Sequence, residues 1–235
     1  MKLIADTIQR TCPEHEIYND LLELDGKTIL ELGCGSAEIT RDLATSGVDR
    51  KITALEVDEV AHQKNLQMAD LTNVTFRLAG AQDIPIADES VDVVFMFKSL
   101  HHVPVDLMEQ SMREIRRVLK PGGLVYISEP VFAGDFNEIL RLFHDEQRVR
   151  EAAFNTVKRA VDEGSFDLVE EVFFNAPRKY DNFDDFENRV LEVTHTNHAL
   201  DESGYREVRH QFEAHLFGDG AHFLVPMRVD LLRKR

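Results

Sequence analysis

The first half of the chain alternates short apolar runs with amphipathic segments, and this alternation strongly limits the folds open to it. The segment Asp106–Leu119 places apolar residues at helical spacing, and Pro121-Gly122-Gly123 is expected to end that helix. Val93–Phe97 is apolar without a break, as is typical of a strand buried on both faces. Strands that alternate with helices need crossover connections and form a parallel sheet. We therefore predict a doubly wound α/β unit with strands at Thr28–Leu32, Lys51–Val57, Val74–Ala79, Val91–Phe97 and Leu124–Glu129.

Charge and composition exclude several classes of partner. The 235 residues include 27 Lys and Arg against 43 Asp and Glu, a formal net charge of −16 that opposes nucleic acid and anionic membrane surfaces. The longest apolar run, Val93–Phe97, has five residues, whereas a membrane span needs roughly 20. The N-terminal residues MKLIADTIQR contain no apolar stretch of signal-peptide length, and Cys12 and Cys34 are compatible with a reducing compartment. These features predict a cytoplasmic protein that binds neither nucleic acid nor membrane.

The second half has a different pattern and is rich in phenylalanine, with 12 of the 15 Phe at or after Phe132. Its last run alternates apolar and other residues with period two, which indicates an antiparallel strand. Two strands are predicted, at Val169–Tyr180 and His222–Lys234. Four helical segments are predicted around these strands. Two are indicated by apolar stripes at helical spacing, one of Phe136, Ile139, Leu140 and Phe143 and one of Ala153, Val157 and Ala160. The other two are Phe183–Glu192 and Ser203–Phe217.

The sequence ILELGCGSAEIT, residues 29–40, contains the residues most typical of a ligand site. An apolar strand ends at Glu31 and Leu32, Gly33 and Gly35 follow, and a helix opens near Ala37. Glycines at such a turn permit positive φ and a close approach of the backbone to a nucleotide-type cofactor. A dinucleotide fingerprint needs Gly or Ala three residues after the second Gly, and Glu38 stands there instead. The acidic Glu31 favours a cofactor that carries positive charge.

The pattern acidic-x-Gly-x-Gly resembles the first motif of class I S-adenosylmethionine-dependent methyltransferases, with Ala37 in place of a third Gly. The resemblance covers roughly residues 27–130 and is nearest to the small-molecule group that includes quinone-biosynthesis C-methyltransferases. Four further stretches match in order: Ala54–Asp58 (ALEVD), Ala79–Pro85 (AGAQDIP), Asp88–Val103 (DESVDVVFMFKSLHHV) and Leu119–Glu129 (LKPGGLVYISE).

The resemblance implies S-adenosyl-L-methionine as cofactor. It assigns the ribose hydroxyls to Glu56 rather than to Asp58. Gly80 stands where many relatives have Asp, which leaves the backbone of Ala81 and Gln82 for the adenine. In this family the position of Cys34 serves backbone contact rather than nucleophilic attack. The implied cofactor-binding residues are Glu31, Gly33, Cys34, Gly35, Ala37, Glu56, Val57, Ala81, Gln82 and Phe97.

The resemblance also implies a Rossmann-like seven-stranded, mostly parallel sheet, with an antiparallel last strand inserted between the fifth and sixth and a helical cap. Residues 1–235 are expected to form one methyltransferase domain, with a cofactor-binding core at about 27–130 and the cap and last two strands at about 131–235. Pro177 and Pro226 disagree with this topology, because proline cannot donate a hydrogen bond within a central strand. They are expected to mark bulges or strand ends, unless the predicted strands are shifted by some residues.

The expected reaction is methyl transfer to a small molecule by in-line displacement, and the acceptor atom (O, N or C) stays open. His102, Glu129 and His101, in that order, are the predicted proton acceptors, while Lys98 either reaches solvent or holds a substrate anion. His195 and His198, with Asp201 nearby, have metal-ligand spacing, but such pairs are common and no metal is expected. The alternatives are a nicotinamide-dependent oxidoreductase and a non-catalytic scaffold.

The residues that follow the fifth strand are expected to close the site. The segment Phe132–Phe217 is predicted to form a mobile cap over the reacting methyl group and to supply most of the acceptor pocket. Its aromatic residues favour a modest, flat or hydrophobic acceptor over a polymer.

Overall fold

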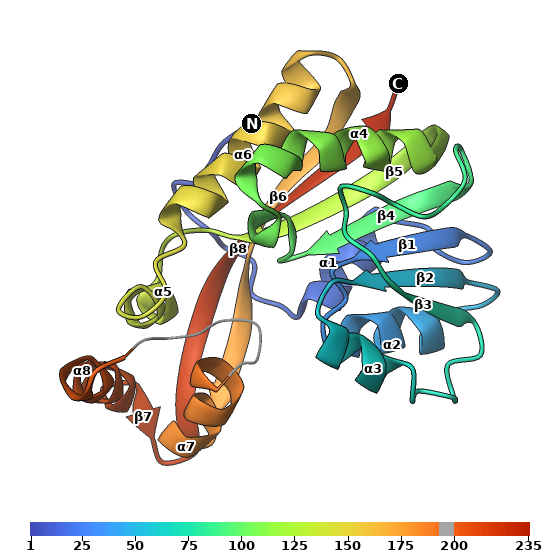
Figure 1. Cartoon of the computed structure of the whole chain (residues 1–235). Coiled ribbons are helices and arrows are strands. Elements are labelled where there is room, and N and C mark those ends of the chain that lie inside the picture. The colour runs from blue at the N-terminus through green and yellow to red at the C-terminus, as the bar shows by residue number, and fades with distance from the viewer. Residues whose placement is uncertain (193–199) are drawn as a thin grey trace.

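The computed structural model describes residues 1–192 and 200–235 and is built on one mixed sheet (Figure 1). The strand order is β3-β2-β1-β4-β5-β8-β6. The five strands of the first half pair in parallel, as predicted. They are β1 (Thr28–Leu32), β2 (Lys51–Glu56), β3 (Val74–Leu78), β4 (Val91–Phe97) and β5 (Leu119–Pro130).

The last long strand, β8 (Gly220–Lys234), lies between β5 and β6 (Phe166–Tyr180) and is antiparallel to both. The predicted insertion of an antiparallel last strand is therefore confirmed. A short extra strand, β7 (Leu216–Phe217), pairs with the start of β8 and is added to the seven strands of the order given above.

The two prolines fit this sheet because each lies where its backbone nitrogen has no neighbouring strand to which it would donate a hydrogen bond. The carbonyl of Pro226 accepts from Val131 N, so its nitrogen faces the side on which β5 has just ended, at Pro130. On the other side Pro226 is opposite Asn175, whose backbone N–H donates to Arg10 O instead of to β8. Pro177, two residues along β6, points to the same outer edge as Asn175. The strands are thus in the predicted place, and the prolines mark a strand end and an edge.

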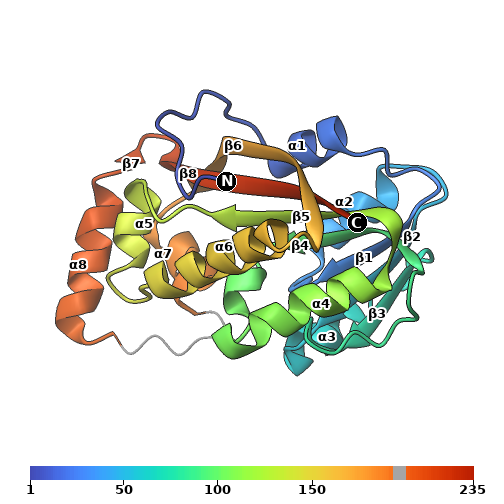
Figure 2. The same ribbon diagram turned by 90° about the horizontal axis from the view of Figure 1, so that it is seen from above.

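Helices cover both faces of the sheet (Figure 2). One face packs against α1 (Glu14–Leu21) and α2 (Glu38–Thr45), and the other packs against α4 (Met108–Val118) and α6 (Gln147–Asp162). The remaining helical elements are α3 (Glu59–Asn65), η1 (Leu100–His102), η2 (Val105–Leu107), α5 (Asp135–Leu140), α7 (Phe183–Phe186), the π-helical turn η3 (Glu187–Leu191) and α8 (Glu202–Glu213). No helix among the described residues combines the length and the apolar content that crossing a membrane requires.

One predicted strand start and one predicted helix end are wrong. The helix predicted to end at Leu119 ends one residue earlier, at Val118, but β5 begins at Leu119 instead of Leu124. Pro121-Gly122-Gly123 therefore lie inside β5 as an irregularity: Val91 pairs with Leu119, but Val93 pairs with Leu124. The predicted helix Ser203–Phe217 also ends early, at Glu213. Its last residues form β7, because the turn that follows brings Phe217 opposite Gly220.

The second half of the chain builds a subdomain at the carboxyl edge of the sheet. Beyond the last β5–β8 pair, Pro130 with Met227, β6 and β8 continue together as far as the pair Tyr180–Ala221. The elements α5, α7, α8 and β7 gather around these projecting strands (Figure 1). Their aromatic rings contact one another, with Phe212 touching the rings of Tyr180, Phe183, Phe186 and Phe223. These phenylalanines therefore extend the buried core of one face of the sheet into the subdomain, and their abundance is explained by packing. The stripe Ala153, Val157 and Ala160 on α6 packs on the sheet instead.

Candidate active site

The turn after β1 presents an open backbone to the carboxyl edge of the sheet. Gly33, Gly35 and Ala37 have φ of 74°, 53° and 59°. A side chain at Gly33 would collide with Ser99, whose Cβ would be 2.7 Å away, whereas a Cβ at Gly35 would meet nothing within 4 Å. Gly33 is therefore required for packing, and Gly35 borders open space. Ala37 takes a left-handed conformation that costs a non-glycine residue roughly 1–2 kcal/mol, which explains why glycine is usual at this place in the motif.

Glu56, the last residue of β2, is buried and turns toward this loop. Its Oε2 accepts a hydrogen bond from Gly35 N at 2.6 Å, and its Oε1 accepts from the N–H groups of Val57 and Asp58, each at 2.8 Å. Asp58 instead caps α3, accepting from Val60 N and Ala61 N. The two acids thus have separate tasks, and Glu56 is the one that faces the glycine loop.

Glu31 is buried beneath the same loop. Its Oε2 accepts a hydrogen bond from Thr40 Oγ1 at 2.6 Å. Burial raises the pKa of Glu31 to about 7, although the Thr40 hydrogen bond and the charge of Lys98 act in the opposite direction. A carboxyl group in this state would be stabilised in its ionised form by a cationic ligand nearby.

The other residues predicted to bind the cofactor surround this loop in different ways. Cys34 is buried, and burial raises the pKa of its thiol, so it is not an activated nucleophile. Ala81 is buried, Gln82 is half-buried and Val57 is exposed. The ring of Phe97 packs in the core against Tyr18 and Tyr126, which leaves its backbone for any contact with a ligand.

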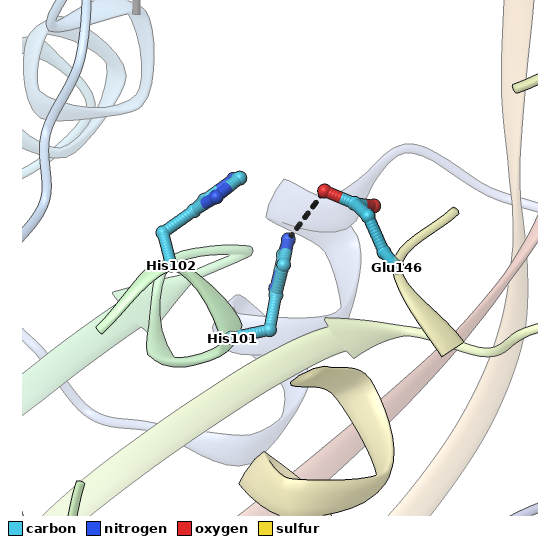
Figure 3. Close-up of side chains that lie close together, drawn as sticks. All are labelled: His101, His102 and Glu146. Carbon is cyan, nitrogen blue, oxygen red and sulfur yellow. Dashed lines mark ion pairs between the residues drawn. The ribbon is translucent and has the colours of Figure 1, made fainter. Parts of the chain in front are cut away.

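A chain of buried charges lies at the ends of β4 and β5. His101 Nδ1 is hydrogen-bonded to Glu129 Oε2. Its Nε2 lies 3.6 Å from Glu146 Oε1, the pair drawn in Figure 3. Burial alone would lower the pKa of His101, but the two carboxylates outweigh it and raise the pKa to about 9. Burial would raise the pKa of Glu129, but His101, Arg228 and the backbone N–H of Leu100 hold it below its usual range. The structure therefore brings two of the three predicted bases together as an ion pair.

His102, the third predicted base, is exposed and follows His101 in η1. The centroids of the two imidazole rings are 4.1 Å apart. Of the three predicted bases, His102 is the one that does not belong to the ion pair of His101 and Glu129.

Sequence reasoning missed two acidic residues of this site, Glu14 and Glu146. Glu14 of α1 forms an ion pair with Lys98 at 3.2 Å, which joins the N-terminal helix to the end of β4. Glu146, just before α6, is bound by Arg150 through Nε at 3.1 Å. The spacing of four residues between Glu146 and Arg150 is a usable helical signal, but nothing local connects Glu14 with Lys98. His195 and His198, considered as metal ligands, lie outside the described residues.

Comparisons with known proteins agree with this arrangement. Residues 30–127 match the family described as a methyltransferase domain. The 27-O-demethylrifamycin SV methyltransferase of Amycolatopsis mediterranei is 32% identical over 139 residues, which cover 56% of this chain and 48% of that protein. The O-methyltransferase rstn1 of Aspergillus nomiae is 33% identical over 136 residues, covering 55% and 59%. A putative methyltransferase of Bacillus halodurans has a similar fold, with a TM-score of 0.65 at 17% identity over 94% of this chain and 98% of that one.

The fold is thus that of the Rossmann-like methyltransferases. Residues 30–127 match the methyltransferase-domain family, and the chain shares its fold with solved methyltransferases. The chain spans about half the length of the curated relatives it matches.

Proposed function

We propose that this protein transfers a methyl group from S-adenosylmethionine to a small-molecule acceptor. The observation that carries the proposal is the joining of Glu56 to the open Gly35 loop, at the same sheet edge as the His101–His102 pair. The names of two relatives, both O-methyltransferases by name or substrate, favour a hydroxyl as the acceptor.

The residues present fit the cofactor. Gly35 leaves room for a ligand against the backbone, and the carboxylate of Glu56, bonded to Gly35 N, would accept hydrogen bonds from the ribose hydroxyls. The buried Glu31 would gain from a positive charge above it. When bound, S-adenosylmethionine supplies the methyl group on a sulfonium sulfur. The protein's contribution is alignment, and effective molarities for well-aligned groups reach roughly 10⁵ M or more.

Removal of the acceptor proton is assigned first to His102. Its side chain is exposed and outside the ion pair of His101 and Glu129. In the unliganded protein the two carboxylates raise the pKa of His101, which makes its imidazole poorly suited to accept the acceptor proton. Glu129 is buried beside it and remains second in order.

The subdomain at the carboxyl edge is proposed as the cap, within a single domain of residues 1–235. Its position beyond the end of β5 supports this role, since ligands of open α/β sheets bind at that edge. A partly hydrophobic acceptor and a cytoplasmic location complete the proposal. The free thiols of Cys12 and Cys34 suit a reducing compartment.

The test is a methyl-transfer screen with labelled S-adenosylmethionine and a panel of small hydroxylated, amine and activated-carbon acceptors. Cofactor binding is measured separately by calorimetry. Labelled product from one acceptor class, with micromolar cofactor binding, is the expected result. A protein that binds no S-adenosylmethionine, or that retains a nicotinamide dinucleotide instead, would overturn the proposal.

A further inference from the structure

His101, His102 and Glu146 bring three potential metal ligands together at the end of β4. Figure 3 shows the two imidazoles projecting from η1 and the carboxylate facing them from the start of α6. One ligand atom from each residue can be chosen so that all three atoms lie within 4.8 Å of one another, a grouping that the rest of the described chain does not repeat. We propose that these three side chains bind a divalent transition-metal ion, with Zn²⁺ as the best-matched ion.

The distance between His101 and Glu146 fits a pair of metal ligands better than a hydrogen bond. His101 Nε2 and Glu146 Oε1 are 3.6 Å apart, which is too long for a hydrogen bond. Ligands about 2.1 Å from a tetrahedral ion lie roughly 3.4 Å from each other. Small side-chain movements would therefore bring these atoms into a coordination shell.

The surroundings of His101 resemble those of a metal-bound histidine. Such histidines almost always direct their other ring nitrogen to a carboxylate or carbonyl group, which fixes the tautomer. Here His101 Nδ1 is bound to Glu129, so a neutral ring would turn its Nε2 lone pair toward Glu146. Glu129 is itself fixed, because its Oε1 accepts a hydrogen bond from the backbone N–H of Leu100 at 2.9 Å.

The carboxylate of Glu146 is held with one oxygen toward the histidines. Arg150 binds Oε2 through Nε at 3.1 Å and Nη2 at 2.5 Å, and Asn137 Oδ1 in turn holds Arg150 at 3.0 Å. Oε1 faces His101 and also contacts His144 Nε2 at 3.0 Å. His144 is therefore a further potential metal ligand, which could keep its contact with Oε1 or bind the ion.

Two imidazoles and one carboxylate are a typical ligand set for Zn²⁺ and for neighbouring first-row ions. Three protein ligands leave at least one coordination position for water or an acceptor oxygen. A bound ion would use the lone pair of His102, so the base and ligand roles exclude each other in one molecule. The inference does not depend on methyl transfer, because ion binding is measured without cofactor or acceptor.

The competing explanation for the same contacts is an imidazolium of His101 placed between two carboxylates. Two metal titrations of tag-free, chelator-treated protein distinguish the metal site from this ion pair. Co²⁺ binding is followed by the visible absorption of the ion, and Zn²⁺ binding is measured in competition with a chromophoric chelator. The test variants are His102→Ala and Glu146→Gln. The matched controls are His210→Ala, an exposed histidine of α8, and Glu151→Gln on α6.

We expect one equivalent of either ion per chain, at least tenfold weaker binding in both test variants, and unchanged binding in both controls. Glu129→Gln should weaken binding roughly 10–100-fold through the orientation of His101. Absence of Co²⁺ and Zn²⁺ binding by the wild-type protein, or equal binding in His102→Ala, overturns the proposal. Circular dichroism checks the fold, and since His102 is exposed its variant decides the question even where Glu146→Gln is unstable.

Discussion

Glu56 Oε2 accepts a hydrogen bond from the backbone N–H of Gly35 at 2.6 Å. This contact joins the end of β2 to the turn after β1 and fixes a loop whose residues have positive φ. Because each bond of a backbone N–H to a carboxylate contributes roughly 1.5–3 kcal/mol, the loop is well ordered before any ligand arrives. A pre-formed loop reduces the entropy that cofactor binding must overcome.

Gly35→Val should abolish binding of S-adenosylmethionine, because a side chain would fill the open space beside the backbone. Gly26→Val is a matched control: Gly26 also has positive φ, at 70°, and its Cβ would meet nothing within 4 Å, but it lies before β1, away from the site. Both variants incur similar backbone strain, so a loss of cofactor affinity in Gly35→Val alone isolates the site effect. Calorimetry that finds equal affinity in both would contradict the assignment of this loop.

Glu56→Ala should weaken cofactor binding and also lower stability, since three backbone N–H groups lose their acceptor. We expect an affinity loss equivalent to roughly 1.5–3 kcal/mol, about 10–150-fold. Asp58→Ala, which removes a helix cap, should cost about 1 kcal/mol of stability and leave affinity nearly unchanged. If the two variants lose equal affinity, Glu56 is not the ribose ligand.

Glu31 predicts a pH dependence of both stability and cofactor affinity. Its pKa of about 7 in the fold exceeds the ordinary value of 4.5, so its contribution to stability is fully present below pH 4.5 and is lost as the pH rises through 7. The shift corresponds to about 3 kcal/mol. A cationic cofactor favours ionised Glu31, so its affinity should rise from pH 6 to pH 8 and binding at pH 6 should release a proton.

Calorimetry in two buffers of different ionisation enthalpy measures the number of protons released when the cofactor binds. Glu31→Gln should remove both the proton release and the pH dependence of affinity. Proton uptake by the wild-type protein, or the same release from the variant, would show that another group titrates.

His102→Ala should lower turnover roughly 10²–10⁴-fold with a hydroxyl acceptor and leave cofactor affinity nearly unchanged. The assay contains a chelator, so that a lost metal ligand is not mistaken for a lost base. Glu129→Gln and His101→Gln are compared in the same assay. Wild-type turnover in all three variants would mean that alignment alone is sufficient.

The cofactor side of the site could be predicted from sequence because its signals are local. Gly33 and Gly35 follow the end of one strand with one residue between them, and Glu56 is the last residue of the next strand, so a parallel sheet brings them together. The charge chain of His101, Glu129 and Glu146 could not be predicted, because it joins three separate elements. Periodicity identifies elements but not which side chains meet across them.

The aromatic residues of the second half illustrate the same limit. Their number suggested an acceptor pocket, yet Phe136, Phe183, Phe186 and Phe212 are all buried against other rings. In this subdomain the rings continue the hydrophobic core of one face of the sheet. No sequence pattern separates rings that pack together from rings that line a cavity.

Phe212→Ala should therefore loosen the cap without unfolding the sheet. The side chain is fully buried among four rings, and truncating such a phenylalanine costs roughly 3–5 kcal/mol. Hydrogen exchange should become faster in α7, α8 and the projecting ends of β6 and β8, and remain unchanged in β1 and β4. Phe217→Ala is the matched control, because that ring is 66% exposed in the same subdomain. In the wild-type protein, cofactor and acceptor together should slow exchange in the cap. Equal protection of cap and sheet in the ligand-free protein, with no change on ligand addition, would exclude a cap that closes over the site.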